Sequence, residues 1–281
     1  MQVTRRLRPR GDSWQLRPQR RDYMVINNNN LPNPFPGVGL TQQTTVTVAT
    51  TTTPTNNYKF KKAGTKGNLI AVVLDESGSM NSCYDSTISG FNEFVAGQRA
   101  AENAGDATLT LNKFDAPHIK TVFENLAIGE APALDKKNYQ PNGGTNLLDC
   151  IGYTIEQVNA TLEKNKKKDR PGVIVLIMTD GEENSSRKFN NAQIKAMVAA
   201  AEKADWSFVF LGANIDAFSV GSAFGMNMSN SVNYSTANMA QTMDTLSATT
   251  VRMRSAKMAG MDTQAVYATT SMTAEERDRI K

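Results

Sequence analysis

Two carboxylates and three hydroxyls stand at turns of this sequence, with no imidazole or thiol in the same loops. They belong to Asp75, Ser77, Ser79, Thr145 and Asp180. Asp75 ends the apolar run 69–74, Asp180 closely follows the apolar run 173–178, and Thr145 lies in a Gly-Gly-Thr turn. A serine nucleophile needs a neighbouring base. These residue types therefore favour oxygen ligation over nucleophilic catalysis.

The two aspartates would repel each other at the ends of neighbouring buried strands, and one would normally have to stay protonated. A hard divalent cation removes that conflict. Carboxylates, hydroxyls and waters are the ligands that Mg²⁺ prefers, with Mn²⁺ as a substitute, whereas zinc favours imidazole and thiolate. The pattern predicts a Mg²⁺ or Mn²⁺ site built from all five residues.

Other interpretations of these residues remain open at this point. Asp75, Ser77 and Ser79 could instead cap a helix, and a metal-assisted hydrolase would use a similar ligand set. The single histidine, His118, is expected at the surface near an edge strand. No phosphate-binding loop with Gly-Lys-Ser/Thr occurs, and an aspartate-nucleophile phosphatase would need a second carboxylate where Ser77 stands.

The elements that position these loops alternate between strand and helix patterns from about Lys59 onward. Apolar residues on consecutive positions indicate buried strands, and apolar residues at a spacing of three and four indicate helices. Alternation of this kind predicts an α/β fold with a mainly parallel sheet and helices on both faces. In such sheets the ligand crevice lies beyond the carboxyl ends of the strands. We expect strands at 68–74, 107–114 (with one solvent-facing side), 119–123, 173–178 and 206–211, and helices at 84–103, 145–164, 191–204, 216–224 and 236–258.

The motif Asp-x-Ser-x-Ser at 75–79, followed by Thr145 and Asp180-Gly181, resembles the metal-ion-dependent adhesion site (MIDAS) of von Willebrand factor A (vWA) domains. The resemblance covers roughly residues 66–258 and includes all five positions in order. It implies a doubly wound sheet with one antiparallel edge strand, at 119–123. It also implies that Ser77, Ser79 and Thr145 bind the cation directly, while Asp75 and Asp180 act mostly through waters or change coordination shell on binding. The stretch 206–217 resembles intracellular vWA proteins of bacteria and phages.

The chain divides by composition into three parts. Residues 1–58 are expected to be a disordered basic tail and an Asn/Pro/Thr-rich linker, residues 59–260 a vWA domain, and residues 261–281 a C-terminal extension. Residues 1–23 hold seven Arg and two acids, whereas the remainder holds 24 basic and 25 acidic side chains. The change from Arg-only to Lys-rich usage suggests that translation begins at Met24. The basic tail could bind nucleic acid or an anionic surface. It lacks interleaved aromatics and helical phasing, so we expect no nucleic-acid partner.

Hydrophobic residues make up 40% and charged residues 21% of the chain, which is typical of a globular protein. No apolar run approaches membrane length and no secretory signal is present. Cys83 and Cys150 are expected to be reduced thiols, which predicts a cytoplasmic location, or the host cytoplasm or a virion for a phage protein.

These features predict a non-enzymatic protein-binding module that depends on a divalent metal. By resemblance, a partner protein supplies an Asp or Glu carboxylate to the metal, and the module works as an adaptor or assembly factor, with an AAA+ ATPase as a candidate partner. The alternative is a structural component of a phage virion or another particle, and a metal-dependent hydrolase is less favoured. Glu76, Asn81, Asn142, Asn146 and Glu182 would set specificity around the metal.

Overall fold

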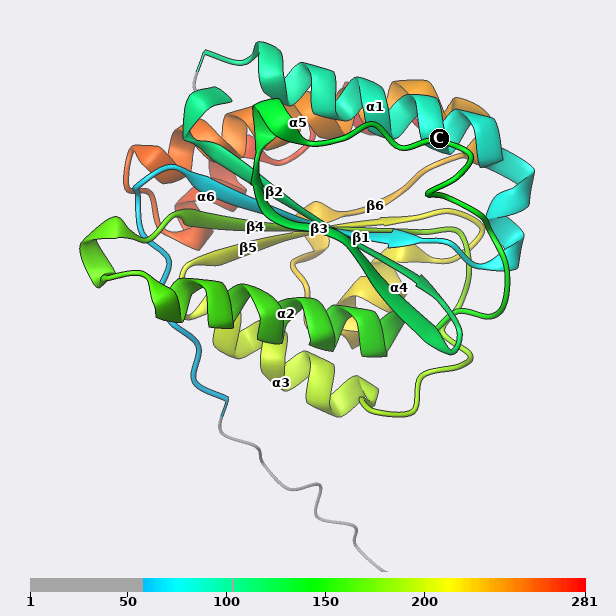
Figure 1. The fold of residues 1–281 in the computed structure, drawn as a ribbon, viewed down its shortest axis with the longest axis horizontal. Helices are drawn as coiled ribbons and strands as arrows, with labels where there is room; N and C mark the ends of the chain where they lie inside the picture. The colour runs from blue at the N-terminus through cyan, green and yellow to red at the C-terminus, as the bar shows by residue number, and fades with distance from the viewer. Residues whose placement is uncertain (1–57, 103) are drawn as a thin grey trace, which may run out of the picture. The chain divides into compact units, whose positions relative to one another are not determined.

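The computed structural model describes residues 58–102 and 104–281, so the expectations for 1–57 lie outside the described residues. A six-stranded sheet with the order β3-β2-β1-β4-β5-β6 forms the centre of the domain (Figure 1). Its strands are β1 Asn68–Asp75, β2 Ala107–Asp115, β3 His118–Ala127, β4 Gly172–Thr179, β5 Trp206–Gly212 and β6 Ser231–Asn233. All neighbouring pairs are parallel except β2 and β3, which are antiparallel. The predicted fold class and antiparallel edge strand are confirmed.

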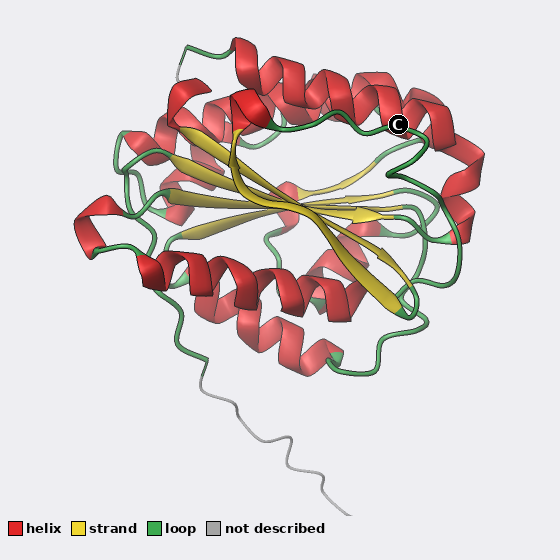
Figure 2. Cartoon of the chain, viewed as in Figure 1, coloured by secondary structure: helices red, strands yellow, loops and turns green. Residues whose placement is uncertain are grey.

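Helices cover both faces of the sheet (Figure 2). They are α1 Tyr84–Ala100, α2 Leu147–Lys164, α3 Asn191–Glu202, α4 Ala217–Ala223, α5 Met239–Met258, α6 Thr263–Thr270 and α7 Ala274–Arg279. Alternate residues of β1 explain the two layers, because successive side chains of a strand point to opposite faces. Ile70, Val72 and Leu74 join the core beneath α1 and α5, whereas Leu69, Ala71 and Val73 join the core beneath α2 and α3.

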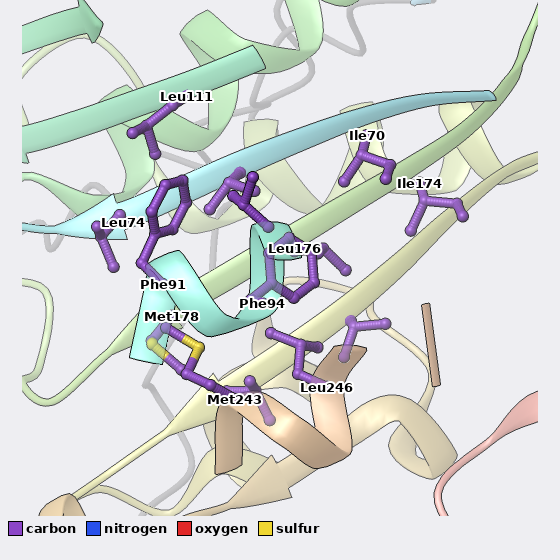
Figure 3. Close-up of a cluster of buried hydrophobic side chains, with 14 of the residues drawn as sticks. Ile70, Leu74, Phe91, Phe94, Leu111, Ile174, Leu176, Met178, Met243 and Leu246 are labelled. Carbon is purple, nitrogen blue, oxygen red and sulfur yellow. The ribbon is translucent and has the colours of Figure 1, made fainter. Parts of the chain in front are cut away.

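The core on the α1 and α5 side combines aliphatic, aromatic and sulfur-containing side chains. Figure 3 shows Phe91 and Phe94 of α1 beside Met243 and Leu246 of α5, close to the strand residue Leu176. All five are at most 4% exposed. Methionines of α5 therefore pack this helix against α1 and the sheet.

The sheet order reverses direction between β1 and β4. The chain runs from β1 outward through β2 to β3 and then returns to β4 on the other side of β1. A crevice at the carboxyl ends of the strands forms at such a switch point. In Figure 1, β1 runs from left to right, so this edge of the sheet lies on the right.

The expectation that β2 has one solvent-facing side is wrong. Every residue of β2 except Thr108 is buried. Its polar face lies under α2, where the Asn112 amide donates to Thr154 Oγ1 (2.9 Å) and Gln157 Oε1 (2.8 Å) and accepts from Thr121 Oγ1 (2.7 Å). Alternating polar residues indicated a solvent-exposed face, but α2 covers this face and its polar side chains bond the Asn112 amide.

Several element boundaries differ from the expected ones. β3 spans ten residues in place of the five predicted, and the short strand β6 was not predicted. The C-terminal residues form α6 and α7, and the Ile280 side chain is fully buried. The Ile280 carbonyl accepts from the Ser235 backbone N–H at 2.8 Å.

Two further expectations concern the cysteines and the membrane. Cys83 and Cys150 are both free and buried. Among the helices of the described part, none combines the length and the apolar character needed to cross a bilayer.

Candidate metal centre

Asp75 ends β1 at the switch point, with a fully buried side chain. Its Oδ1 accepts from the Ser77 backbone N–H at 2.7 Å, and its Oδ2 accepts from the Thr179 hydroxyl at 2.6 Å. Thr179 is the last residue of β4, so neighbouring strands hold this carboxylate from two sides. The orientation of Asp75 is therefore fixed by the protein itself.

A chain of hydroxyls connects the loop after β1 to Asp180. The Ser77 and Ser79 oxygens lie 3.1 Å apart, and Ser79 Oγ donates to Asp180 Oδ1 at 2.5 Å. Asp180 and Ser77 are buried, while Ser79 is exposed. The other oxygen of Asp180, Oδ2, is buried and has no hydrogen-bond partner among the described residues.

Thr145 reaches the same place from the loop before α2. Gly143 adopts a φ of +64°, and a Cβ there would lie 2.6 Å from the Ala116 carbonyl oxygen, so the turn requires glycine. The Gly143 carbonyl accepts from the Gly78 N–H at 3.1 Å. A Cβ placed on Gly181 would lie 3.4 Å from Thr145 Oγ1 and 3.6 Å from Ser79 Oγ. The two hydroxyls therefore surround one point beside Gly181.

The two neighbouring carboxylates of this cluster disfavour each other's ionised form. Burial raises the pKa of Asp75 to about 6, and the nearby charge of Asp180 adds to that rise. Burial likewise raises the pKa of Asp180. In the described part of the chain, no lysine, arginine or histidine forms an ion pair with either carboxylate. A divalent cation would compensate both charges and satisfy Asp180 Oδ2, so the residues fit the expected metal.

The cluster brings together all five residues predicted from the sequence. It contains two carboxylates, and within residues 58–102 and 104–281 no group of three or more His, Cys, Asp or Glu side chains could hold a metal. Any metal here would depend on hydroxyl oxygens and water for the rest of its ligands, which suits Mg²⁺ or Mn²⁺ better than zinc. The identity of the ligands and of the metal stays a prediction.

Sequence reasoning missed residues that support this cluster. Thr179 fixes Asp75, and Asn184 Oδ1 accepts from the Thr145 backbone N–H at 2.9 Å. Glu183 accepts from the Leu148 N–H at the start of α2 (2.9 Å) and from the Ser186 N–H (2.7 Å), so it connects the loop after β4 to that helix. The sequence did contain a signal for Thr179, because this residue directly follows the apolar run 173–178 and precedes Asp180.

The surrounding residues expected to set specificity include both buried and exposed side chains. Glu76 and Asn146 are 1% and 2% exposed, whereas Glu182 is exposed. Glu76 forms an ion pair with Lys113 at 2.6 Å, and Asn146 Nδ2 donates to the His118 carbonyl at 3.2 Å. His118 itself has a 64% exposed side chain at the start of β3, as expected.

Comparison with known proteins identifies a fold and no family. No protein-family model matches the chain, and no curated protein matches it. Among solved structures, the pilus adhesin SpaC from Lactobacillus rhamnosus GG in its open conformation aligns with a TM-score of 0.50 at 13% identity, over 70% of this chain and 31% of that one. Proximal thread matrix protein 1 from the mussel byssus, with a zinc-occupied MIDAS motif, aligns with a TM-score of 0.48 at 14% identity, over 67% of this chain and 48% of that one.

The VWA domain of SpRpn10 aligns with a TM-score of 0.44 at 10% identity, over 62% of this chain and 94% of that one. This chain therefore spans about half the length of the mussel protein and about a third of the adhesin. At these identities the likeness is one of fold. It is consistent with the α/β fold expected from the motifs, while a complete MIDAS and a bacterial or phage affinity stay predictions.

Proposed function

We propose that this chain is a non-enzymatic protein-binding module that depends on Mg²⁺ or Mn²⁺ bound at Asp75, Ser77, Ser79, Thr145 and Asp180. The observation that carries the proposal is the pair of buried carboxylates with no cation beside them in the described part and with Asp180 Oδ2 unpartnered. Leaving such an oxygen buried costs free energy. Binding a cation would therefore stabilise the folded protein.

The residues have separate tasks in this proposal. Thr179 and the Ser77 N–H hold Asp75 in place, and Asp180 offers its unpartnered oxygen. Ser79 and Thr145 place hydroxyl oxygens around the point beside Gly181. When bound, the cation supplies the positive charge that attracts an Asp or Glu carboxylate of a partner protein.

The wider role follows from the resemblance to intracellular vWA proteins. We propose an adaptor or assembly factor in the cytoplasm, with an AAA+ ATPase as a candidate partner. A structural component of a phage virion or another particle is the alternative, and recovery of the chain in purified particles would favour it. A hydrolase is less favoured because His118, the single histidine, lies at the start of β3 with its Nδ1 3.4 Å from Asp115 Oδ1 and takes no part in the cluster.

The test is capture of partners from a lysate in Mg²⁺ and again in EDTA. Wild type is expected to retain a defined set of proteins only with metal, and Asp75→Asn is expected to lose them. Asp85→Asn makes the same chemical change at a 77% exposed side chain and should behave as wild type. Identical capture in Mg²⁺ and EDTA, or metal-dependent turnover of phosphoester or peptide substrates, would refute the proposal.

A further inference from the structure

A polar cavity lies directly beside the candidate metal centre and plays no part in it. It has a volume of about 260 Å³ and is lined by Glu76, Lys113, Lys120, Lys137 and Gln140, among others. One wall is the face of the β2–β3 hairpin that carries Lys113 and Lys120. The other wall is the loop that contains residues 137–140. Three lysines and one carboxylate line the cavity, so its net charge is positive and favours an anionic ligand.

The two hairpin lysines stand opposite each other in the antiparallel register of β2 and β3. Like charges in that position repel, and the buried carboxylate of Glu76 lies between them. Lys113 Nζ is 2.6 Å from Glu76 Oε1, and Lys120 Nζ is 3.6 Å from Glu76 Oε2. Lys120 also lies 3.2 Å from Asp115 Oδ2 at the rim. Glu76 therefore balances Lys113, while Lys120 donates a hydrogen bond to Asp115 and, with three N–H donors and a 49% exposed side chain, can bind a further acceptor.

Two groups of the cavity are incompletely paired within the described residues. Glu76 Oε2 is buried and accepts no hydrogen bond from the described residues, since the Lys120 ammonium is too distant. The Lys137 ammonium forms no ion pair within residues 58–102 and 104–281. The cavity thus offers cations for an acidic group and one acceptor for a hydrogen-bond donor. An acidic residue in an extended peptide carries both, as its carboxylate and its backbone N–H.

The cavity and the metal centre are built from adjoining residues of the same two segments, the end of β1 and the loop that leads to Thr145. Glu76 directly follows Asp75, and the Glu76 carbonyl accepts from the Asn142 N–H at 2.8 Å. The loop that lines the cavity at residues 137–140 continues to Thr145. Adjacent residues of an extended chain point to opposite sides with their Cα atoms 3.8 Å apart, so the two sites lie on the order of 10 Å from each other. An extended peptide covers that span in about three residues.

We propose that this cavity is an acidic-peptide subsite that takes a second carboxylate of the partner, about three residues from the one that reaches the metal. Lys120 and Lys137 bind the second carboxylate, and Glu76 Oε2 accepts a backbone N–H of the same residue. The inference rests on the proposed function in one respect, because the first carboxylate of the partner is the one that reaches the metal. Binding of the second carboxylate at the lysines needs no metal.

The experiment uses nine-residue Gly/Ser peptides that carry two glutamates three residues apart, either glutamate alone, or none. Affinities are measured by titration in Mg²⁺, and the ammonium signals of Lys120 and Lys137 are followed by NMR. Exposed ion pairs contribute modestly, so with two lysines the second glutamate is expected to tighten binding by about two- to thirtyfold. The gain should fall at high salt, because screening shortens the reach of exposed charges to about 3 Å at 1 M.

Matched variants locate the effect. Lys120→Gln with Lys137→Gln should remove the gain from the second glutamate. Lys136→Gln changes the same charge at a neighbouring side chain that is 72% exposed and pairs with Asp85 outside the cavity, and it should keep the gain. Lys113 is left intact because its buried pair with Glu76 is expected to support folding.

The outcomes separate this inference from the proposed function. Shifts of the Lys120 and Lys137 signals by the two-glutamate peptide in EDTA, without any effect of Mg²⁺ on affinity, would support the subsite and refute the metal-dependent function. Metal-dependent binding to which the second glutamate and the two lysines add nothing would refute the subsite and leave the function standing. Peptides that shift neither lysine in either condition would refute the subsite as well.

Discussion

Replacing Asp75 with asparagine should make the metal-free protein more stable while it abolishes the response to metal. The variant retains the hydrogen bonds of the site. Asparagine Oδ1 can accept from the Ser77 N–H, as Asp75 does at 2.7 Å. Its Nδ2 can donate to Thr179 Oγ1, because the Thr179 hydroxyl has a second acceptor in the Gly181 carbonyl at 3.1 Å. The substitution therefore removes a buried charge and leaves no polar group unsatisfied.

The magnitude follows from the pKa of Asp75, which burial raises from 3.8 to about 6. A shift of roughly two units corresponds to about 3 kcal/mol of unfolding free energy. Because the folded pKa is the higher one, the unfolded state releases its proton first, and wild type loses stability as the pH rises from about 4 to about 6. Above pH 6 in EDTA, Asp75→Asn should be about 3 kcal/mol more stable, or roughly 6–12 °C in Tm. Near pH 4 this advantage should vanish.

Thermal and urea unfolding in EDTA at pH 7.5 and at about pH 4 measures this difference. Mg²⁺ at a hundred times its Kd should then stabilise wild type by about 2.7 kcal/mol and leave the variant unchanged. Asp85→Asn, at a 77% exposed side chain, is the matched control and should follow wild type throughout. A variant that is less stable than wild type in EDTA at pH 7.5, or that responds equally to Mg²⁺, would show that Asp75 bears no uncompensated charge and binds no metal.

Three further predictions test the site, the tail and an unrelated buried charge. Thr145→Ala should weaken partner capture more than metal affinity, because Mg²⁺ accepts water in place of a neutral oxygen, whereas Asp180→Ala should abolish both; calorimetry beside capture assays measures the two. Deletion of residues 1–23 should leave the Tm and the Mg²⁺ response within about 1 °C, since that segment has no apolar periodicity, and a Tm several degrees lower would contradict this. Burial lowers the pKa of Lys257 to about 8 from 10.5, so its charge destabilises the fold below pH 8 and the cost disappears as the pH rises to 10.5. Lys257→Met should accordingly show its largest gain in unfolding free energy, about 3 kcal/mol, below pH 8, and a gain that does not vary with pH would refute the assignment.

The sequence was sufficient for the fold class and for the place where the five site residues meet. The two apolar runs predicted β1 and β4, and the polar residues that follow them lie at one edge because both strands are parallel and adjacent. Motif spacing contributed as well, since Thr145 is distant in sequence and no periodicity relates it to Asp75. Its position depends on the turn at Gly143, whose positive φ is visible only in the structure.

Other features depend on tertiary contacts that no local pattern reveals. The polar face of β2 looked solvent-exposed because Thr110 and Asn112 alternate with leucines, and only the approach of α2 makes that face buried. Glu76 looked like an exposed loop residue, yet its ion pair with Lys113 forms across 37 residues of chain. β6 has three residues, too few to show any periodicity.

The amide of Asn112 has a consequence for the geometry of the metal centre. It makes three hydrogen bonds: both N–H groups donate to α2, and the oxygen accepts from β3. Sliding α2 by one turn, about 5.4 Å, would leave buried donors without acceptors at a cost of about 1–3 kcal/mol each. The longitudinal position of α2 is therefore set inside the domain, about two turns from its first residue, Leu147. Since Thr145 stands two residues before that helix, we expect that substitutions at Pro141 and Asn142, which precede the glycine turn, can alter which partner is recognised without displacing the hydroxyl.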